Sequence, residues 1–171
     1  MERLKAHIRN IPDFPKPGIQ FKDITPLTKD PAMMRLAVNQ LIHPFLGDEI
    51  TAVAGMEARG FIFGSLAAWV LGVSFVPLRK PGKLPHDIES LSYDLEYGSA
   101  SLEIHRDALN SNDKVLLVDD LIATGGTAVA SCQLIEKLGA EISACAFVVE
   151  LDDLNGRGLL SKYRVHSLVH Y

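Results

Sequence analysis

The sequence has few cysteines and no excess of basic residues, and both shortages narrow the possible functions. Only two of its 171 residues are cysteines, Cys132 and Cys145, and they show neither CxxC spacing nor a matching histidine pattern. A reduced, cytoplasmic chain is therefore the simplest interpretation. The formal net charge of -4 argues against non-specific nucleic-acid binding, which needs a basic surface.

The chain also lacks the patterns of a secretory signal or a membrane span. Its first ten residues, MERLKAHIRN, are charged and amphipathic, unlike a signal peptide. Residues 60–78 carry no charge and are long enough to span a bilayer. Gly72 divides them, however, into a helical apolar pattern and a strand-like run. A buried helix followed by a buried strand explains this segment, so we expect no membrane association.

Two common nucleotide-binding motifs are absent from the most conspicuous stretch, Lys114 to Thr127 (KVLLVDDLIATGGT). No GK[ST] follows its glycines, so it is not a P-loop, and it does not match GxGxxG. What it does contain is a buried strand at 114–118, two carboxylates, a short loop at 121–123, and a Thr-Gly-Gly-Thr turn before a helical pattern that ends near Leu138.

This stretch has the chemistry of a site for a sugar phosphate. Gly125 and Gly126 allow a ligand to approach the backbone closely. Free amides at a helix N-terminus, with the hydroxyls of Thr124 and Thr127, favour a phosphate. Adjacent carboxylates accept hydrogen bonds from neighbouring sugar hydroxyls and stabilise a sugar carbon that becomes cationic. The pattern therefore predicts binding of a ribose 5-phosphate.

Alternation of strands and helices predicts an α/β domain spanning residues 1–171, with a mainly parallel five-stranded sheet flanked by helices. The expected strands are 50–54, 73–78, 114–118, 142–149 and 164–169. The expected helices are 2–10, 31–45, 60–71 and the segment from the Gly-Gly-Thr turn to Leu138. Prolines and a glycine predict a stiff, irregular strap at 11–21. Residues 79–98 predict a long mobile hairpin. Ligands of such sheets bind beyond the carboxyl ends of the strands, where four polar clusters fall: Glu57–Arg59, Arg79–Lys80, Asp119–Thr127 and Glu150–Asp153.

At these residues the chain resembles the type I phosphoribosyltransferases, whose phosphoribosyl-pyrophosphate motif is similar to VLLVDDLIATGGT. The segments PDFPKPGIQFKDIT, GMEARGFIFG, RKPGKLP, YDLEYG and LEIH resemble the adenine-specific branch of that family, in its order. The likeness covers nearly the whole chain and is weakest in the last twenty or so residues.

The resemblance implies transfer of a phosphoribosyl group from phosphoribosyl pyrophosphate to adenine, giving AMP and pyrophosphate. It implies that Ala123, Thr124, Gly125, Gly126 and Thr127 bind the 5-phosphate and that Asp119 and Asp120 hold the ribose hydroxyls. Arg59 and Lys83 would meet pyrophosphate, and Arg79 and Lys80 belong to the same substrate-binding set. Phe21 would stack on adenine with Leu151 opposite, while Gln20 and Lys22 would read the base edge through their main chain. Glu96 would transfer a proton at the purine imidazole ring, with Tyr97 beside it.

The resemblance also implies an N-terminal hood at residues 1–30 over the base site, a flexible lid at 79–98, and a homodimer in which Arg79 reaches the neighbouring subunit's site. The expected partners are small-molecule substrates, with no nucleic acid and no membrane. The sequence shows no dedicated metal cage, so Mg²⁺ should arrive with phosphoribosyl pyrophosphate.

Alternatives remain open at several of these positions. The structural alternatives are an ion pair with Glu57 for Arg59, a solvated hairpin carboxylate for Glu96, a plain core position for Phe21 and an ordinary loop charge for Lys83. Specificity for a 6-oxopurine such as xanthine or hypoxanthine would keep the fold and change the base. The acidic run Glu150-Leu151-Asp152-Asp153, in place of a lysine, fits a 6-amino base better. A non-catalytic module that senses phosphoribosyl pyrophosphate is the third possibility.

Overall fold

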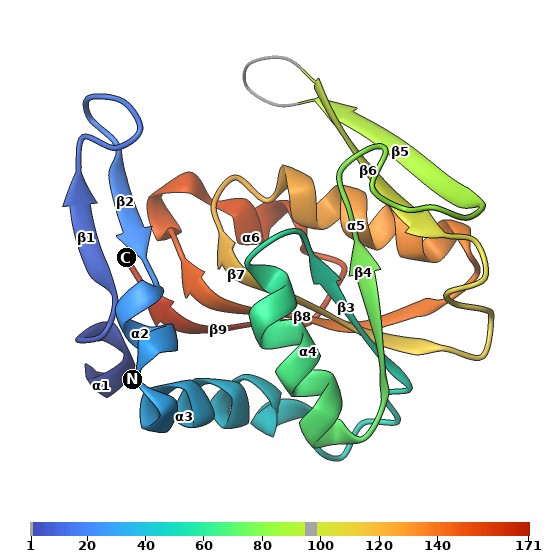
Figure 1. Cartoon of the computed structure of the whole chain (residues 1–171), viewed down its shortest axis with the longest axis horizontal. Coiled ribbons are helices and arrows are strands. Elements are labelled where there is room, and N and C mark those ends of the chain that lie inside the picture. The colour runs from blue at the N-terminus through green and yellow to red at the C-terminus, as the bar shows by residue number, and fades with distance from the viewer. Residues whose placement is uncertain (1, 95–98) are drawn as a thin grey trace.

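The computed structural model describes residues 2–94 and 99–171 and has a five-stranded sheet at its centre. The strand order is β4-β3-β7-β8-β9, and every neighbouring pair is parallel (Figure 1). The strands are β3 (Ala52–Met56), β4 (Ser74–Leu78), β7 (Lys114–Ile122), β8 (Glu141–Glu150) and β9 (Val165–His170). The predicted α/β fold with a five-stranded sheet is confirmed.

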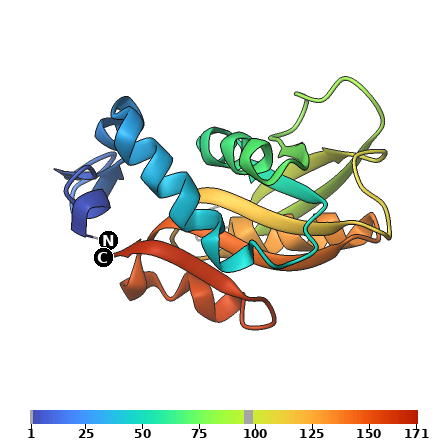
Figure 2. The same ribbon diagram turned by 90° about the horizontal axis from the view of Figure 1, so that it is seen from below.

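Helices cover both faces of this sheet because its central strands are apolar on both sides. In β7, Leu116 and Val118 pack into one core while Val115 and Leu117 pack into the other, as the two-residue period of a strand requires. α3 (Pro31–Ile42) and α4 (Gly60–Leu71) cover the first face, and α5 (Gly126–Lys137) and α6 (Gly156–Leu159) cover the second (Figure 2).

The helix boundaries follow capping chemistry that is visible in the sequence. Asp30 accepts hydrogen bonds from Ala32 N at 2.8 Å and Met33 N at 3.2 Å, and Pro31 occupies the first position of α3. α4 ends at Gly72, which has a φ of 70°. The apolar segment 60–78 is thus helix α4 followed by strand β4, as predicted. No helix within residues 2–94 and 99–171 has the length and apolar character needed to cross a membrane.

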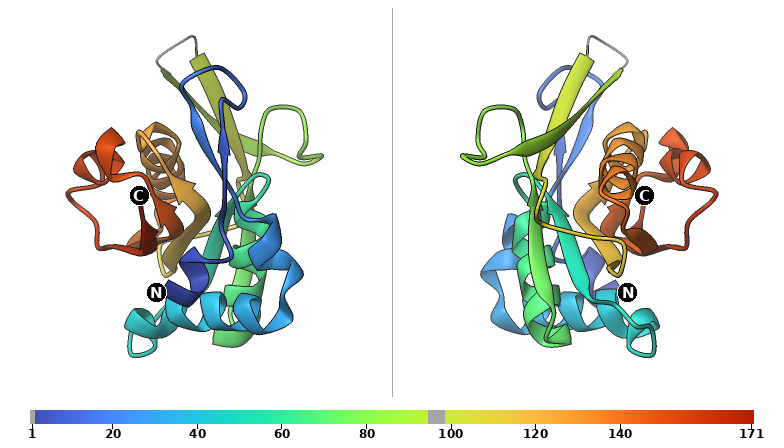
Figure 3. Two further views of the ribbon diagram at one scale, coloured as in Figure 1. Left: turned by 90° about the vertical axis from the view of Figure 1, so that its left-hand side faces the viewer. Right: turned by 90° about the vertical axis from the view of Figure 1, so that its right-hand side faces the viewer.

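Two antiparallel ribbons lie outside the central sheet. β1 (Arg9–Pro12) pairs with β2 (Gln20–Asp23), and β5 (Ile88–Asp94) pairs with β6 (Ser99–His105). Both ribbons project beyond the same edge of the sheet (Figures 1 and 3). That edge contains the carboxyl ends of β3 and β7, so the ribbons flank the expected ligand position.

The structure corrects three boundaries. The helix predicted at 2–10 is only α1 (Glu2–Lys5), and the segment predicted to be irregular contributes residues to both β1 and β2. Prolines are tolerated there because Pro12 ends its strand and Pro15 and Pro17 lie in the connection. β7 continues to Ile122, where a loop was expected, because its pairing with β8 extends to Ile122 and Glu150.

The remaining short elements connect these parts. They are α2 (Thr25–Lys29), η1 (His43–Phe45) and η2 (Asp152–Leu154). α2 leads from β2 to α3, so it links the β1–β2 ribbon to the helix layer on one face of the sheet.

Candidate active site

A pocket of about 740 Å³ lies at the carboxyl edge of the sheet, between the end of β3, the end of β7 and the β5–β6 hairpin. Many of the predicted site residues line it. They are Arg59, Lys80, Asp119, Asp120, Ala123, Thr124, Gly125, Gly126 and Thr127. Gln20, Phe21, Lys22, Arg79, Lys83 and Leu151 are not part of this lining. The structure therefore brings the predicted sugar-phosphate residues together in one cavity.

The turn between β7 and α5 has the geometry of an anion site. Gly125 has a φ of 84°, a conformation that favours glycine, and the next residue begins the twelve-residue helix α5. The first amides of a helix have no partners within it, and the helix dipole places partial positive charge at the same point. A phosphate that enters the pocket meets these groups directly.

A second glycine, Gly156, supports this turn from the first residue of α6. A Cβ on Gly156 would collide with the carbonyl oxygen of Ala123, and a Cβ on Gly125 would collide with the carbonyl of Gly156. The two backbones therefore pack in direct contact. Sequence reasoning missed Gly156, because nothing local indicates that its neighbour lies about thirty residues earlier.

Of the paired carboxylates at the end of β7, Asp120 is buried and Asp119 is half-buried. Burial, followed by the neighbouring charge of Asp120, raises the pKa of Asp119 well above its ordinary value. Burial also raises the pKa of Asp120, but the Arg59 guanidinium opposes that shift.

Arg59 is paired with Asp120, so the predicted alternative of a pair with Glu57 is wrong. Arg59 Nε lies 3.0 Å from Asp120 Oδ2. The contact does not align as a hydrogen bond, and within the described part of the chain this buried oxygen has no hydrogen-bond partner. The positive charge of Arg59 therefore compensates this buried carboxylate oxygen in place of a hydrogen bond.

Gly60, the first residue of α4, allows the helix to approach the acidic pair. A Cβ at this position would lie 2.8 Å from Asp119 Oδ1 and 3.0 Å from the Val118 carbonyl oxygen. The start of α4 therefore packs directly against the end of β7. This contact fixes the position of the Asp119 carboxylate from one side.

Glu57 also lines the pocket, and its carboxylate pairs with cationic side chains beside it. Its carboxylate bonds the Lys83 ammonium, the Arg79 guanidinium at 3.1 Å and the Lys80 backbone amide at 3.2 Å. The Lys83 hydrogen bond is the largest of the contacts that lower the pKa of Glu57 to about 2. Arg79 and Lys83 thus lie next to the pocket but are bonded to Glu57. Sequence reasoning placed Glu57 in a polar cluster at this edge of the sheet but did not predict its pairing with Arg79 and Lys83.

The predicted base-binding residues lie beside the pocket rather than in its lining. The Arg59 guanidinium lies 5.4 Å from the centre of the Phe21 ring, so Arg59 contacts both Asp120 and Phe21. Leu151 follows β8 directly, and its amide donates to the Ile122 carbonyl at the end of β7. Phe21 and Leu151 therefore flank the same edge of the sheet from two different elements.

The β5–β6 hairpin contacts the Thr-Gly-Gly-Thr turn, the predicted phosphate site, through Tyr93. The Tyr93 hydroxyl lies 3.2 Å from Thr127 Oγ1, and Tyr93 lines the pocket. Sequence reasoning placed Tyr93 in the hairpin without a role. Glu96 and Tyr97, the predicted catalytic residues, lie outside the described residues.

The carboxylates that line the pocket in the described part of the chain are not grouped as metal ligands. Among residues 2–94 and 99–171, the group with metal-ligand geometry is Glu150, Asp152 and His170, which do not line the pocket. Hard cations such as Mg²⁺ need several oxygen ligands, and Asp120 and Glu57 already pair with cations of the chain. The donor set fits a metal that enters with an anionic substrate.

Comparison with known proteins agrees with this geometry. Residues 29–169 match the family model described as the phosphoribosyl transferase domain. The chain is 71% identical to the adenine phosphoribosyltransferase of Methylococcus capsulatus over 171 residues, which cover 100% of both chains.

Solved structures are similar over the same length. The crystal structure of adenine phosphoribosyltransferase from Rhodothermus marinus has a TM-score of 0.95 and 50% identity, with 99% of this chain and 97% of that chain covered. The enzyme from Saccharomyces cerevisiae, complexed with an imino-altritol bisphosphate and adenine, has a TM-score of 0.92 and 40% identity, with 98% and 97% covered.

Proposed function

The chain belongs to the phosphoribosyl transferase domain family, and from this premise we propose that it is an adenine phosphoribosyltransferase. It transfers the 5-phosphoribosyl group of phosphoribosyl pyrophosphate to adenine and releases AMP and pyrophosphate. One observation supports this conclusion most strongly: the Asp119–Asp120 pair and the glycine turn at the start of α5 line the same pocket. One end suits a sugar diol and the other a phosphate, which together define a ribose 5-phosphate.

The proposed roles of the pocket residues follow their positions. Ala123 to Thr127 hold the 5-phosphate, and Asp119 and Asp120 accept hydrogen bonds from the ribose hydroxyls. Arg59, Arg79, Lys80 and Lys83 form the cationic side that receives pyrophosphate. Binding there requires Arg79 and Lys83 to exchange the Glu57 carboxylate for phosphate oxygens.

Adenine would stack on Phe21 with Leu151 opposite, and the main chain of Gln20 and Lys22 would read its edge. The segment after β8 supports a 6-amino base, because Leu151 is followed by Asp152 and Asp153 rather than by a lysine that donates to a 6-oxo group. This feature favours adenine over the 6-oxopurines.

The reaction forms a bond between an imidazole nitrogen of adenine and the anomeric ribose carbon as the bond from that carbon to pyrophosphate breaks. The proton on the imidazole ring passes to Glu96, with Tyr97 beside it. The sugar carbon becomes cationic on the way, and the Asp119–Asp120 charge stabilises it. Water would capture such a cation, so the site must close. Residues 79–98 form the proposed lid, and residues 1–30 form the proposed hood.

Mg²⁺ belongs to the substrate in this proposal. Bound to the diphosphate, it offsets the negative charge that grows on the leaving pyrophosphate. The chain contributes Arg59 and the cations around Glu57 to the same task.

We also propose that the protein is a homodimer. α4 presents a stripe of exposed apolar side chains: Ile62 at 39%, Leu66 at 37%, Trp69 at 80% and Val70 at 44% exposure. Their spacing places them on one face of the helix, and a second copy of the chain would bury that face. Arg79 would then reach the partner's pocket.

Turnover separates an enzyme from a module that only senses phosphoribosyl pyrophosphate. Incubation with adenine, phosphoribosyl pyrophosphate and Mg²⁺ should yield AMP and pyrophosphate in equal amounts, many times over the protein concentration. Saturable binding of phosphoribosyl pyrophosphate without AMP would support the sensing module instead.

A further inference from the structure

The aromatic ring of Tyr171 lies between two lysines at the base of the β1–β2 ribbon. The ammonium of Lys22 is 3.9 Å from the ring centre, and that of Lys5 is 4.5 Å away. Burial, followed by the charge of Lys5, lowers the pKa of Lys22, so the contact is partly shielded from water. Cation–π contacts strengthen when they are desolvated. Tyr171 therefore holds β2 through Lys22, the residue that follows Phe21.

The main chain of Tyr171 contacts the other wall of the base site. Its amide donates to the Glu150 carbonyl at 3.0 Å, and its carbonyl accepts from the Asp152 amide at 2.8 Å. These two bonds bracket Leu151. One residue thus contacts the neighbours of both Phe21 and Leu151, the first through its ring and the second through its backbone.

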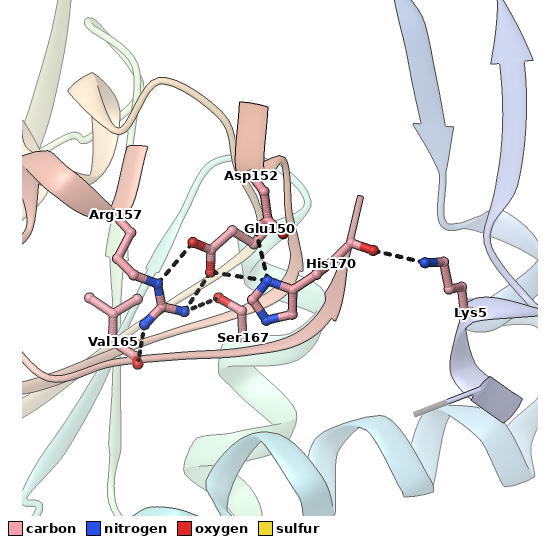
Figure 4. A network of polar contacts seen from close by, with 7 residues as sticks. All are labelled: Lys5, Glu150, Asp152, Arg157, Val165, Ser167 and His170. Carbon is pink, nitrogen blue, oxygen red and sulfur yellow. Dashed lines mark hydrogen bonds and ion pairs between the residues drawn. The ribbon is translucent and has the colours of Figure 1, made fainter. Parts of the chain in front are cut away.

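The segment around Leu151 is itself firmly held. Arg157 donates to both carboxylate oxygens of Glu150, at 2.9 and 2.6 Å, and His170 Nδ1 lies 2.8 Å from Asp152 Oδ1 (Figure 4). Because Arg157 already pairs with Glu150, we interpret Glu150, Asp152 and His170 as residues that hold the segment around Leu151 in place rather than as metal ligands. Lys5 adds a bond to the His170 carbonyl at 2.9 Å, which joins α1 to β9 (Figure 4).

β2 has fewer contacts with the segment around Leu151. Lys22 Nζ donates to Asn10 Oδ1 at 2.9 Å, and Asn10 Nδ2 donates to Gln20 Oε1 at 2.7 Å, so these bonds stay within the β1–β2 ribbon. The contacts of Lys5 and Lys22 with the Tyr171 ring, and the Lys5 bond to His170, tie the ribbon and α1 to the sheet.

We propose that Tyr171 is a positioning residue for the purine base: its ring and main chain fix the separation between Phe21 and Leu151. This inference rests on the proposed function, because it assumes that adenine binds between those two side chains. Loss of the ring would loosen β2 relative to Leu151 and weaken adenine binding. It would leave the phosphoribosyl end of the pocket intact, because Tyr171 does not line that pocket.

Steady-state kinetics of Tyr171→Ala, Tyr171→Leu and Tyr171→Phe test the proposal. In the Ala and Leu variants the KM for adenine should rise about 3- to 30-fold, the range that corresponds to a partly desolvated cation–π contact. The KM for phosphoribosyl pyrophosphate should change less than about twofold. Tyr171→Phe keeps the aromatic face and should restore the adenine KM. Tyr171→Leu keeps apolar volume, so its adenine KM tests the role of the aromatic ring if the Ala variant does not fold.

Tyr163→Ala is the matched control, because Lys162 lies 4.7 Å from the Tyr163 ring in the same kind of contact, away from the β1–β2 ribbon. It should lower the thermal midpoint without a selective change in adenine KM. A folded Tyr171→Leu variant with an unchanged adenine KM, or equal rises in both KM values, would overturn the positioning role. Absence of AMP formation by the wild-type protein would instead overturn the proposed function.

Discussion

Charged side chains in and beside the pocket pair with one another in the structure. Asp120 lies against Arg59, and Glu57 holds Arg79 and Lys83. In the proposed function, substrate phosphates replace Glu57 as the partners of Arg79 and Lys83, so binding exchanges one set of ion pairs for another. Such an exchange keeps buried charges compensated in both states, which limits the cost of leaving a charge unpaired.

Asp120→Asn should reduce turnover by on the order of 10² or more while the fold survives, because the amide keeps the shape but removes the charge that stabilises the cationic sugar. Pyrophosphate release and far-ultraviolet circular dichroism measure the two properties. Asp48→Asn is the control, since Asp48 pairs with Arg164 at 2.7 Å outside the pocket. Near-normal turnover of Asp120→Asn would refute the ribose-hydroxyl role.

Glu57→Gln should change how stability depends on pH. The folded chain holds the pKa of Glu57 at about 2, below its ordinary value of 4.5, mainly through Lys83. A depressed carboxyl pKa contributes stability that is complete above the ordinary value and is lost as pH falls through the folded value. Urea unfolding of the wild type should therefore show a loss of free energy of unfolding between about pH 5 and pH 2 that is smaller in Glu57→Gln.

The control for that experiment is Glu49→Gln, because Glu49 pairs with Lys114 at 2.6 Å but is largely exposed. Exposed pairs contribute little, so its profile should follow the wild type closely. Parallel profiles for the wild type and Glu57→Gln would show that the Glu57 contacts do not stabilise the fold.

The elements that carry the site are those whose ends meet at the carboxyl edge of the sheet. β7 supplies the carboxylates, α5 supplies the free amides, and the start of α4 packs against the end of β7. The turn at Gly125 is supported in the same way by α6 through Gly156. The site geometry thus depends on backbones that approach one another without side chains between them.

Gly60→Ala should disturb this junction. Its methyl group would meet Asp119 Oδ1 at 2.8 Å and the Val118 carbonyl at 3.0 Å, so α4 or the carboxylate must shift. We expect the free energy of unfolding to fall by about 1–3 kcal/mol and kcat/KM for phosphoribosyl pyrophosphate to fall with it. Gly47→Ala, where nothing lies within 4 Å, should change neither. Wild-type kinetics in Gly60→Ala would mean that the junction does not position Asp119.

The sequence predicted elements best where burial alone determines them. β7 and β8 contain continuous buried apolar runs at 115–118 and 144–149, which is typical of a sheet covered on both faces. The Thr-Gly-Gly-Thr turn was predictable as a phosphate site because its residues are adjacent in the sequence. The β1–β2 ribbon was missed because proline content argued against strands, although an edge ribbon tolerates proline at a strand end. Gly156, Glu57 and Tyr171 act through partners distant in the chain, so no local pattern reveals them.

At the scale of the whole molecule, a contact joins segments near the two ends of the described chain, because Lys5 Nζ donates to the His170 carbonyl at 2.9 Å (Figure 4). α1 and β9 are therefore one structural unit, which anchors the proposed hood to the sheet. The exposed stripe of α4 lies on a different part of the surface and is the main apolar surface of the described helices. In the proposed dimer a second copy of the chain covers this stripe.

Trp69→Glu should convert the proposed dimer to a monomer, because a charge would be placed in the centre of the apolar stripe. Sedimentation or light scattering gives the mass. Glu substituted at the exposed Leu159, which lies on α6 and is 61% exposed, should leave the mass unchanged. A wild-type monomer, or a Trp69→Glu dimer of unchanged affinity, would contradict the α4 interface.

The central claim is that one edge of the sheet joins a phosphoribosyl group to adenine. Its most direct test is kcat/KM for pyrophosphate release with adenine, hypoxanthine, guanine and xanthine in turn, at saturating phosphoribosyl pyrophosphate and Mg²⁺. A site built to bind a 6-amino base rejects bases that leave its polar groups unpaired, so adenine should be preferred by at least about 100-fold. An equal or higher value for any 6-oxopurine would contradict the account.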